Sequence, residues 1–228
     1  MDSILKVEDV SFSYQNKYQT VHAVKKADCS FEQGKAYAIV GKSGSGKTTL
    51  LSLLAGLELP WGGRILYKGQ STKDINRDAY RRDNAAVIYQ NYNLFPLLTV
   101  MENVLYSMNL KKIRGKEAHE RAEKELLAVG ITADQFKRFP PQLSGGEQQR
   151  VAIARALAAG NEVILADEPT GNLDEGNSGQ VVNILLKLAH EEGRCVIIIT
   201  HDREIAARMD KIYTMQDGVL EEEETDEH

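Results

Sequence analysis

A glycine-rich octapeptide at residues 41–48 carries the clearest chemical signal in this chain of 228 residues. Its letters, GKSGSGKT, match the spacing G-x-x-x-x-G-K-[ST], and they lie between an apolar run, AYAIVG, and a helix-forming run, KTTLLSLLAGL. Glycines in such a loop let backbone N–H groups turn toward phosphate, and the start of the following helix adds a positive dipole. This context favours a site for ATP over a plain glycine-serine turn.

Within this loop, we expect Lys47 to reach the β and γ phosphates during catalysis and Thr48 to bind Mg²⁺. The residues of the loop and the helix start that we expect to bind the nucleotide are Gly41, Lys42, Ser43, Gly44, Ser45, Gly46, Lys47, Thr48 and Thr49.

Two acids end another apolar run, VILADEP. Asp167 suits the Mg²⁺ shell of an enzyme with such a phosphate loop. Glu168 is placed to polarise an attacking water molecule as a general base. Taken alone, the two acids could equally cap a strand at a turn where Pro169 ends the pairing. The phosphate loop elsewhere in the chain favours the catalytic interpretation.

Three further residues gain weight only as members of this set. His201 follows the apolar run CVIIIT, and Gln90 follows AAVIY. Tyr14, in VEDVSFSYQ, could stack on adenine. Alternatively, Val10, Phe12 and Tyr14 share one face of an alternating strand, and the tyrosine is simply packed. We favour stacking for Tyr14 and catalytic roles for His201 and Gln90.

The elements that would position these residues read as an alternation of strands and helices. Continuous Val/Ile/Leu runs such as AYAIV, AAVIY, EVILA and CVIIIT suit strands buried on both faces of a parallel sheet. Helical segments such as GQVVNILLKLAHEEG intervene, which predicts an α/β fold. Ligands of such sheets bind beyond the carboxyl ends of the strands. That edge would collect Lys47, Gln90, Asp167, Glu168 and His201.

The stretch QLSGGEQQRVAIARAL opens a second helix with glycines in its first turn. Ser144 and Glu147 form a capping box, but Gly145 and Gly146 each weaken the helix by roughly 1 kcal/mol relative to alanine. Bare backbone at a helix start is useful where a phosphate must come close. Because residues 41–48 already hold one γ-phosphate, we expect this helix to face a nucleotide held by a second copy of the chain.

Composition excludes several other classes of protein. The net charge is −5 and the pI about 5.6, which argues against an electrostatic nucleic-acid binder. Cys29 and Cys195 stand far apart without a CxxC pattern, so a disulfide framework or zinc site is not indicated and a reducing, cytosolic setting fits. No signal peptide opens the chain, and no apolar run approaches the roughly 20 residues that span a bilayer. We expect a soluble chain without direct bilayer insertion, able to dock on a membrane protein.

The full set of motifs resembles the nucleotide-binding subunit of ABC transporters. The motifs occur in the family's order: GKSGSGKT, Gln90 as the Q-loop, LSGGE as the signature, ILADE as Walker B, NLD as the D-loop and His201 as the switch histidine. The resemblance implies that Ser144, Gly145 and Gly146 contact the γ-phosphate of the opposite subunit's ATP. It also implies that Asp174 lies in the dimer interface, and that Gln90 joins Thr48 and Asp167 around Mg²⁺.

The same resemblance implies a single domain over residues 1–228 with the fold of P-loop NTPases. We expect a mainly parallel, RecA-like sheet, an N-terminal antiparallel β subdomain and a helical subdomain inserted at about residues 91–160. The acidic residues 221–228 are expected to form a frayed tail.

A narrower resemblance follows from DEPTGNLD and NLFPLLTVMENV. Both are similar to ATPases of macrolide export, lipoprotein release, antimicrobial-peptide export and a cell-division complex. Gly171 and Asn172 favour this branch over many importers. The resemblance implies an ATP-dependent dimer on the cytoplasmic face of the cell membrane that drives an integral membrane permease. The segment after Gln90 is dense in Leu, Phe, Pro and Met, and part of it would form the core of the helical subdomain. Its other interpretation is a groove around residues 94–98 that receives a short helix of the membrane partner. Neither the substrate nor the direction of transport is specified by these motifs.

Three alternatives are weaker. A soluble ABC-type ATPase of DNA repair would carry a long coiled coil, and no sustained heptads occur here; translation factors usually carry two cassettes in one chain. A regulatory module that binds ATP without turnover is disfavoured by the presence of both Glu168 and His201. The ATPase of an ABC importer is the third alternative, which Gly171 and Asn172 disfavour.

Overall fold

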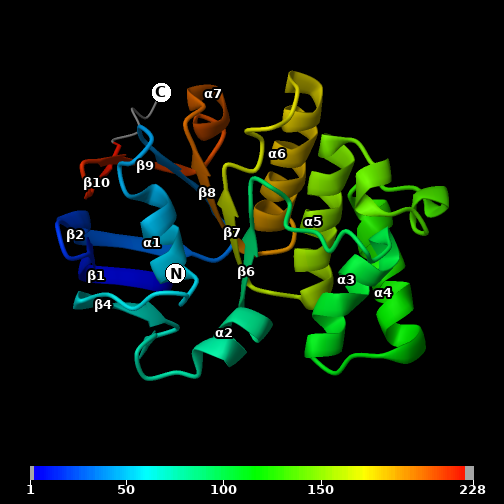
Figure 1. The fold of residues 1–228 in the computed structure, drawn as a ribbon, viewed down its shortest axis with the longest axis horizontal. Helices are drawn as coiled ribbons and strands as arrows, with labels where there is room; N and C mark the ends of the chain where they lie inside the picture. Colours follow the sequence, from blue (N-terminus) through cyan, green and yellow to red (C-terminus); the bar gives the residue numbers. More distant parts are fainter. Residues whose placement is uncertain (1–2, 224–228) are drawn as a thin grey trace.

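The computed structural model describes residues 3–223 of the chain, which fold around two sheets (Figure 1). The larger sheet is mainly parallel, and only its edge strand β10 runs antiparallel to a neighbour in the described residues. In spatial order its strands are β10 (Val219–Glu222), β9 (Lys211–Gln216), β3 (Ala36–Val40), β8 (Cys195–Thr200), β7 (Val163–Asp167) and β6 (Ala85–Ile88). The buried runs β3, β7 and β8 therefore form the centre of a parallel sheet, as their continuous apolar letters predicted.

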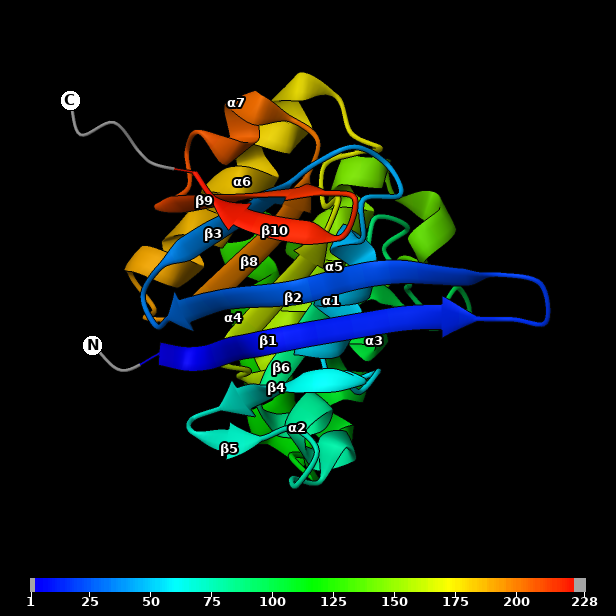
Figure 2. The same ribbon diagram turned by 90° about the vertical axis from the view of Figure 1, so that its left-hand side faces the viewer.

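The smaller sheet is antiparallel and comes mostly from the N-terminal part of the chain. Its spatial order is β2 (Thr20–Glu32), β1 (Ser3–Gln15), β4 (Gly62–Tyr67) and β5 (Gln70–Ser71). The hairpin between β1 and β2 extends beyond the body of the molecule, as Figure 2 shows. It brings Tyr14 and Val21 opposite each other near the phosphate loop.

The helices occupy two regions. α1 lies between the two sheets, whereas α3, α4 and α5 lie together on the other side of the large sheet (Figure 1). The α-helices are α1 (Lys47–Leu54), α2 (Arg77–Asp83), α3 (Val100–Leu110), α4 (Gly115–Ala128), α5 (Gly145–Ala159), α6 (Glu175–His190) and α7 (Arg203–Ala206). Two short 3₁₀ turns, Ala133–Gln135 and Pro140–Gln142, join α4 to α5. Across residues 3–223, no helix combines the length and the apolar character that a bilayer-spanning segment needs.

Alternate residues of β3 face two different cores, because successive side chains of a strand point to opposite faces. Tyr37 and Ile39 pack with α1 and the antiparallel sheet. Ala36, Ala38 and Val40 belong to a core that also contains the buried residues of α3, α4, α5 and α6. The helices of residues 100–159 therefore share one continuous core with the large sheet.

The expected start of the acidic tail is wrong. Glu221 and Glu222 lie in strand β10, where they pair with Thr214 and Tyr213 of β9. The next residue, Glu223, accepts a hydrogen bond from Arg203 at 2.5 Å. Backbone pairing and an ion pair thus order these acids, and residues 224–228 lie outside the described part of the chain.

The shared core predicts that the helices and the sheets unfold together. Ile153 of α5 is fully buried in that core, so Ile153→Ala should lower the free energy of unfolding by about 3 kcal/mol. Urea unfolding can be followed by helical circular dichroism and by fluorescence of Trp61, the single tryptophan, which packs edge-on against Phe12 beside the antiparallel sheet. Both midpoints should fall together. Phe12 belongs to the second core, which β3 joins to the first, so a circular dichroism midpoint that falls while the fluorescence midpoint stays in place would show that the two cores unfold separately.

Candidate active site

The phosphate loop joins the carboxyl end of β3 to the start of α1. Gly46, the N-cap of α1, has a φ of 110°, and a Cβ there would lie 2.1 Å from the carbonyl oxygen of Ala23. A Cβ at Gly41 would lie 2.2 Å from the carbonyl oxygen of Met215. Neighbouring strands thus force glycine at both ends of the loop. Within the described residues no side chain caps α1, which leaves the N–H groups of its first turn available to phosphate oxygens.

Lys47 lies folded back against this loop. Its Nζ donates to the carbonyl oxygens of Gly41 at 2.8 Å and Lys42 at 2.9 Å, and the residue is only 7% exposed. Burial lowers the pKa of the ammonium group, and the nearby carboxylates of Glu168 and Asp167 oppose that shift. The loop therefore holds a positive charge close to the N–H groups of α1.

Two of the three predicted Mg²⁺ ligands, Thr48 and Asp167, lie side by side. Thr48 Oγ1 donates to Asp167 Oδ1 at 3.4 Å. Burial raises the pKa of Asp167, while the hydrogen bond from Thr48 and the charge of Lys47 act in the opposite direction. Mg²⁺ is commonly bound by one or two protein oxygens together with phosphate oxygens of the substrate. A hydroxyl beside a carboxylate at the phosphate loop fits that pattern, and the described residues contain no larger acidic cluster for a metal.

Glu168 is held in an unusual backbone conformation directly after β7. Its φ is 47°, in the left-handed region that non-glycine residues rarely adopt. The backbone is fixed there because Glu168 N donates to the carbonyl oxygen of Ile199 at 3.0 Å and Gly171 N donates to Glu168 O at 3.1 Å. Glu168 Oε2 lies 2.9 Å from His201 Nδ1, which leaves Oε1 free of that contact. The strain directs the carboxylate into the cleft beside the imidazole.

Gln90 borders the cleft but points toward the loop that follows Glu168. Its Nε2 donates to Asn172 Oδ1 at 3.5 Å, and Asn172 Nδ2 donates to the carbonyl oxygen of Gln90 at 3.2 Å. A Cβ at Gly171 would lie 2.7 Å from Gln90 Nε2. In this structure Gln90 contacts the D-loop rather than Thr48 or Asp167, so its place in a Mg²⁺ shell stays a prediction.

Tyr14 forms one wall of the cleft. It is 50% exposed, whereas Phe12, which meets it edge-on at 5.1 Å between ring centroids, is 6% exposed. Tyr14 Oη shares a hydrogen bond of 3.3 Å with Thr49 Oγ1 of α1. The ring is thus supported at its edge and tip while half of it remains exposed, which suits stacking on a base.

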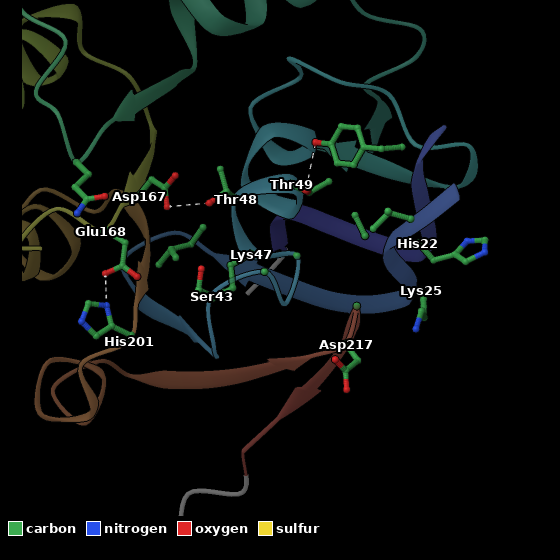
Figure 3. Close-up of a pocket in the computed structure, with 18 residues that line it drawn as sticks. His22, Lys25, Ser43, Lys47, Thr48, Thr49, Asp167, Glu168, His201 and Asp217 are labelled. Atoms are coloured by element: carbon green, nitrogen blue, oxygen red, sulfur yellow. Dashed lines mark hydrogen bonds and ion pairs between the residues drawn. The ribbon is translucent and has the colours of Figure 1, made fainter. Parts of the chain in front are cut away.

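Together these residues enclose a cleft of about 720 Å³ at the edge of the large sheet (Figure 3). Eleven expected residues line it: Tyr14, Ser43, Gly44, Gly46, Lys47, Thr48, Thr49, Gln90, Asp167, Glu168 and His201. The expected loop residues Gly41, Lys42 and Ser45 line a separate hollow behind the loop. Residues that sequence analysis missed come from β2, from β8 and from the turn between β9 and β10: Val21, His22, Ala23, Lys25, Ile199, Asp217 and Gly218.

Ser144 and the first turn of α5, residues 144–147, form the signature turn. The signature turn does not line this cleft. Its predicted capping box is confirmed, because Ser144 Oγ accepts from Glu147 N at 3.3 Å and Ser144 N donates to Glu147 Oε2 at 2.7 Å. A Cβ at Gly146 would lie 2.3 Å from Asn177 Oδ1. Contrary to expectation, packing against α6 within one chain is already a reason for glycine at this position. Asp174, expected at a dimer interface, caps α6 by accepting from Asn177 N at 3.0 Å.

Comparison with known proteins agrees with this geometry. A family model described as ABC transporter matches residues 24–171. The chain is 42% identical over 204 residues to an uncharacterized ABC transporter ATP-binding protein, YclH of Bacillus subtilis, covering 90% of this chain and 89% of YclH. It is 38% identical over 226 residues to the lipoprotein-releasing system ATP-binding protein LolD of Idiomarina loihiensis, covering 98% and 99%. It is also 40% identical over 220 residues to the macrolide export ATP-binding/permease protein MacB of Hyphomonas neptunium, covering 95% of this chain but 34% of MacB.

A solved structure shares the fold. The dimeric, post-hydrolysis structure of the ATP-binding cassette MJ0796 of Methanocaldococcus jannaschii, bound to ADP and Pi, superposes with a TM-score of 0.89 at 35% identity. The superposition covers 96% of this chain and 98% of the MJ0796 chain.

The ionised Asp167 that a Mg²⁺ site would need is predicted to lower the stability of the fold, because the side chain is partly buried. Because its pKa is raised in the folded state, ionisation of Asp167 opposes folding, and this penalty is complete at neutral pH and shrinks as the pH falls through the pKa. Asp167→Asn should therefore raise the thermal midpoint at pH 7 by about 1–2 °C, a small effect because the group is partly solvated. The rise should be smaller at pH 4.

Asp174→Asn is the control with the opposite sign. Hydrogen bonds from Asn177 lower the pKa of Asp174, so its ionised form stabilises the fold above the usual carboxyl pKa, and that contribution is lost in acid. This variant should lower the midpoint at pH 7 and change it less at pH 3. Equal gains for Asp167→Asn at pH 7 and pH 4 would refute a buried, destabilising charge.

Proposed function

This chain belongs to the ABC transporter family, and we propose that it is the ATP-hydrolysing subunit of a membrane complex in the lipoprotein-release and macrolide-export branch. The relatives confirm the family, the branch and the fold class that the motifs predicted. The observation that carries the proposed activity is the cleft itself, where a phosphate loop, a hydroxyl–carboxylate pair and a glutamate–histidine pair meet at one sheet edge. The MJ0796 dimer bound to ADP and Pi supports hydrolysis as the reaction.

In the proposed reaction, the loop amides and Lys47 hold the β and γ phosphates of ATP. Thr48 and Asp167 are the residues that would hold Mg²⁺, which supplies positive charge to the phosphate oxygens. Glu168 accepts a proton from the attacking water through the carboxylate oxygen that His201 does not contact. His201 orients that carboxylate through its bond of 2.9 Å.

The proposal includes a dimer with two shared ATP molecules. Ser144 is exposed and Gly145 half-buried, whereas Gly146 is buried, so α5 is accessible to a second copy at Ser144 and Gly145 while lying outside its own cleft. The γ-phosphate of ATP in the second copy would accept from this turn only when the two copies are closed. A ligand shifts an equilibrium by its differential affinity for the two states, so ATP favours the closed dimer and ADP favours it less.

A groove between α3 and α5, which includes Phe95 a few residues after Gln90, is the proposed contact with a permease. It has a volume of about 240 Å³, and its exposed apolar residues are Phe95, Tyr106 and Leu110, with the first two rings 4.7 Å apart. Arg155 lines the same groove and donates to the backbone carbonyl oxygens of residues 92 and 93 at 3.2 and 2.8 Å. A short apolar helix of the permease seated there would therefore contact the segment that leads to Gln90.

This arrangement leads to a proposed location for the protein and a proposed activity for its complex. Through the permease it would lie on the cytoplasmic face of the cell membrane. By analogy with LolD and MacB, the complex would release lipoproteins from a membrane or export macrolide antibiotics. The resemblance of the motifs adds peptides to these candidate substrates.

Removing the proposed general base should trap the dimer. Glu168→Gln should slow ATP turnover by at least about a hundredfold while ATP still binds, because the amide cannot accept the proton. With ATP and Mg²⁺, light scattering should then report twice the mass of one chain. A Glu168→Gln variant that stays monomeric under these conditions would refute the shared-ATP dimer.

Lys47→Ala provides the matched comparison. It removes a charge that contacts the phosphates, so ATP affinity itself should fall by about tenfold or more, and no dimer should form. Near-normal ATP affinity in this variant would contradict the assignment of the loop.

A charge in the groove should separate transport from hydrolysis. Phe95→Glu should release the permease from purified complexes, because the groove would have to desolvate a carboxylate, while ATPase activity of the isolated chain stays within about twofold. Of residues 94–98, where a groove was expected, only Phe95 lines the groove in the structure. Leu97→Glu is therefore the matched control, since Leu97 is 87% exposed but does not line the groove. Copurification from detergent measures both. Equal retention of the permease by the two variants would refute the groove as the contact.

A further inference from the structure

The side chain of Asn177, in the first turn of α6, connects three segments of the chain. Its Nδ2 donates to Asp174 Oδ2 at 2.6 Å, and its Oδ1 accepts from Arg150 Nη1 of α5 at 3.0 Å. The same Oδ1 occupies the space where a side chain at Gly146 would begin, 2.3 Å from the ideal Cβ position. One amide therefore contacts the D-loop, the first turn of the signature helix and an arginine one turn further along that helix.

The amide of Asn177 suits both of its partners at this junction. Only a group with both a donor and an acceptor can donate to a carboxylate and accept from a guanidinium at once. Aspartate in its place would set two carboxylates against each other, and an aliphatic side chain would leave both partners without this contact. The guanidinium of Arg150 has one other side-chain acceptor, Gln180 Oε1 at 3.1 Å, and its Nε is buried without a partner in the described residues.

The D-loop is tied at its other end to the catalytic cleft. Gly171 N donates to the carbonyl oxygen of Glu168, and Asn172 exchanges hydrogen bonds with Gln90. A segment of only a few residues thus runs from the proposed general base to Asp174 and from there, through Asn177, to the signature turn. Movement of the signature turn relative to the D-loop would have to break the contacts of Asn177.

We infer that Asn177 is a positioning residue that locks the signature turn to the D-loop, so that one copy presents both to the second copy as a single unit. This inference rests on the proposed ATP-dependent dimer. Without the lock, the two elements would have to be aligned when the dimer forms, and the entropy of that ordering would weaken association. ATP binding within one copy would not change, because Asn177 does not line the nucleotide cleft.

The test measures the dimer dissociation constant by analytical ultracentrifugation in the Glu168→Gln background, with ATP and Mg²⁺. Asn177→Ala removes both charge-assisted hydrogen bonds of the side chain, while alanine keeps the helix intact. The entropy of aligning the two released elements should raise the dimer dissociation constant by about tenfold. Binding of a fluorescent ATP analogue, at protein concentrations where only monomer is present, should change by less than about twofold. The thermal midpoint of the monomer is recorded for each variant.

Gln180→Ala is the matched control. Gln180 lies one turn after Asn177 in α6, and the substitution removes the other side-chain acceptor of Arg150. It leaves the link that Asn177 forms between Asp174 and Gly146 in place. It should leave the dimer constant within about twofold. Asn177→Asp keeps an acceptor for Arg150 but repels Asp174, and it should weaken the dimer as Asn177→Ala does. This second variant decides the question if the alanine variant is poorly folded.

The outcomes separate the two levels of the proposal. If Glu168→Gln forms the ATP-dependent dimer and both Asn177 variants leave its dissociation constant unchanged, the positioning role is refuted and the proposed function stands. The role is also refuted if Gln180→Ala weakens the dimer as much as Asn177→Ala. If Glu168→Gln itself never dimerises, the dimer and the inference that rests on it both fail.

Discussion

The parallel register of β3, β8 and β7 is the constraint on which the site depends. Val40 at the end of β3 is level with Thr200 of β8, and Ile199 is level with Asp167 at the end of β7. Adjacent strands lie about 4.8 Å apart, so the first residues after each strand must be neighbours. The phosphate loop, His201 and Glu168 all begin at those positions. A slip of one residue in the pairing of β7 with β8 would turn Asp167 to the other face of the sheet.

The parallel register also explains why Lys47 and Asp167 lie at a partly buried edge of the sheet, where burial disfavours their ionised forms. The strands are fully buried up to their last residues, and Lys47 and Asp167 follow or end them. Burial shifts both pKa values toward the neutral form, lowering that of Lys47 and raising that of Asp167. Phosphate and Mg²⁺ would compensate these groups. A fold that holds uncompensated charges near its core therefore gains stability from its substrate.

The helices of residues 100–159 extend this site outward rather than forming a separate body. α5 is part of the main core, yet its first turn is at the surface and its Arg155 contacts the Q-loop backbone. The D-loop lies between Glu168, the proposed general base, and this helix, with polar contacts at both ends. Short hydrogen-bonded links thus join the groove to the Q-loop, the Q-loop to the D-loop, and the D-loop to the helix of the signature turn. These links would couple a permease contact to the chemistry of ATP.

Local signals in the sequence were sufficient to predict the elements and most of the side chains that meet in the cleft. The spacing of the phosphate loop, the acids after β7 and the capping box of Ser144 and Glu147 each depend on residues a few positions apart, and their chemistry can be read without a fold. The continuous apolar runs likewise predicted a parallel sheet and hence a common edge.

Contacts between distant segments were decided only by the tertiary structure. His22, Lys25 and Asp217 line the cleft because a hairpin and a β-turn approach the phosphate loop in space, and no motif marks them. The bond of Gln90 to Asn172 and the fit of Gly146 against Asn177 join residues far apart in sequence. Hydrogen bonding and close packing act between atoms that are near in space. The sequence by itself therefore determined which chemical groups this protein carries, and the folded chain determined which of these groups meet.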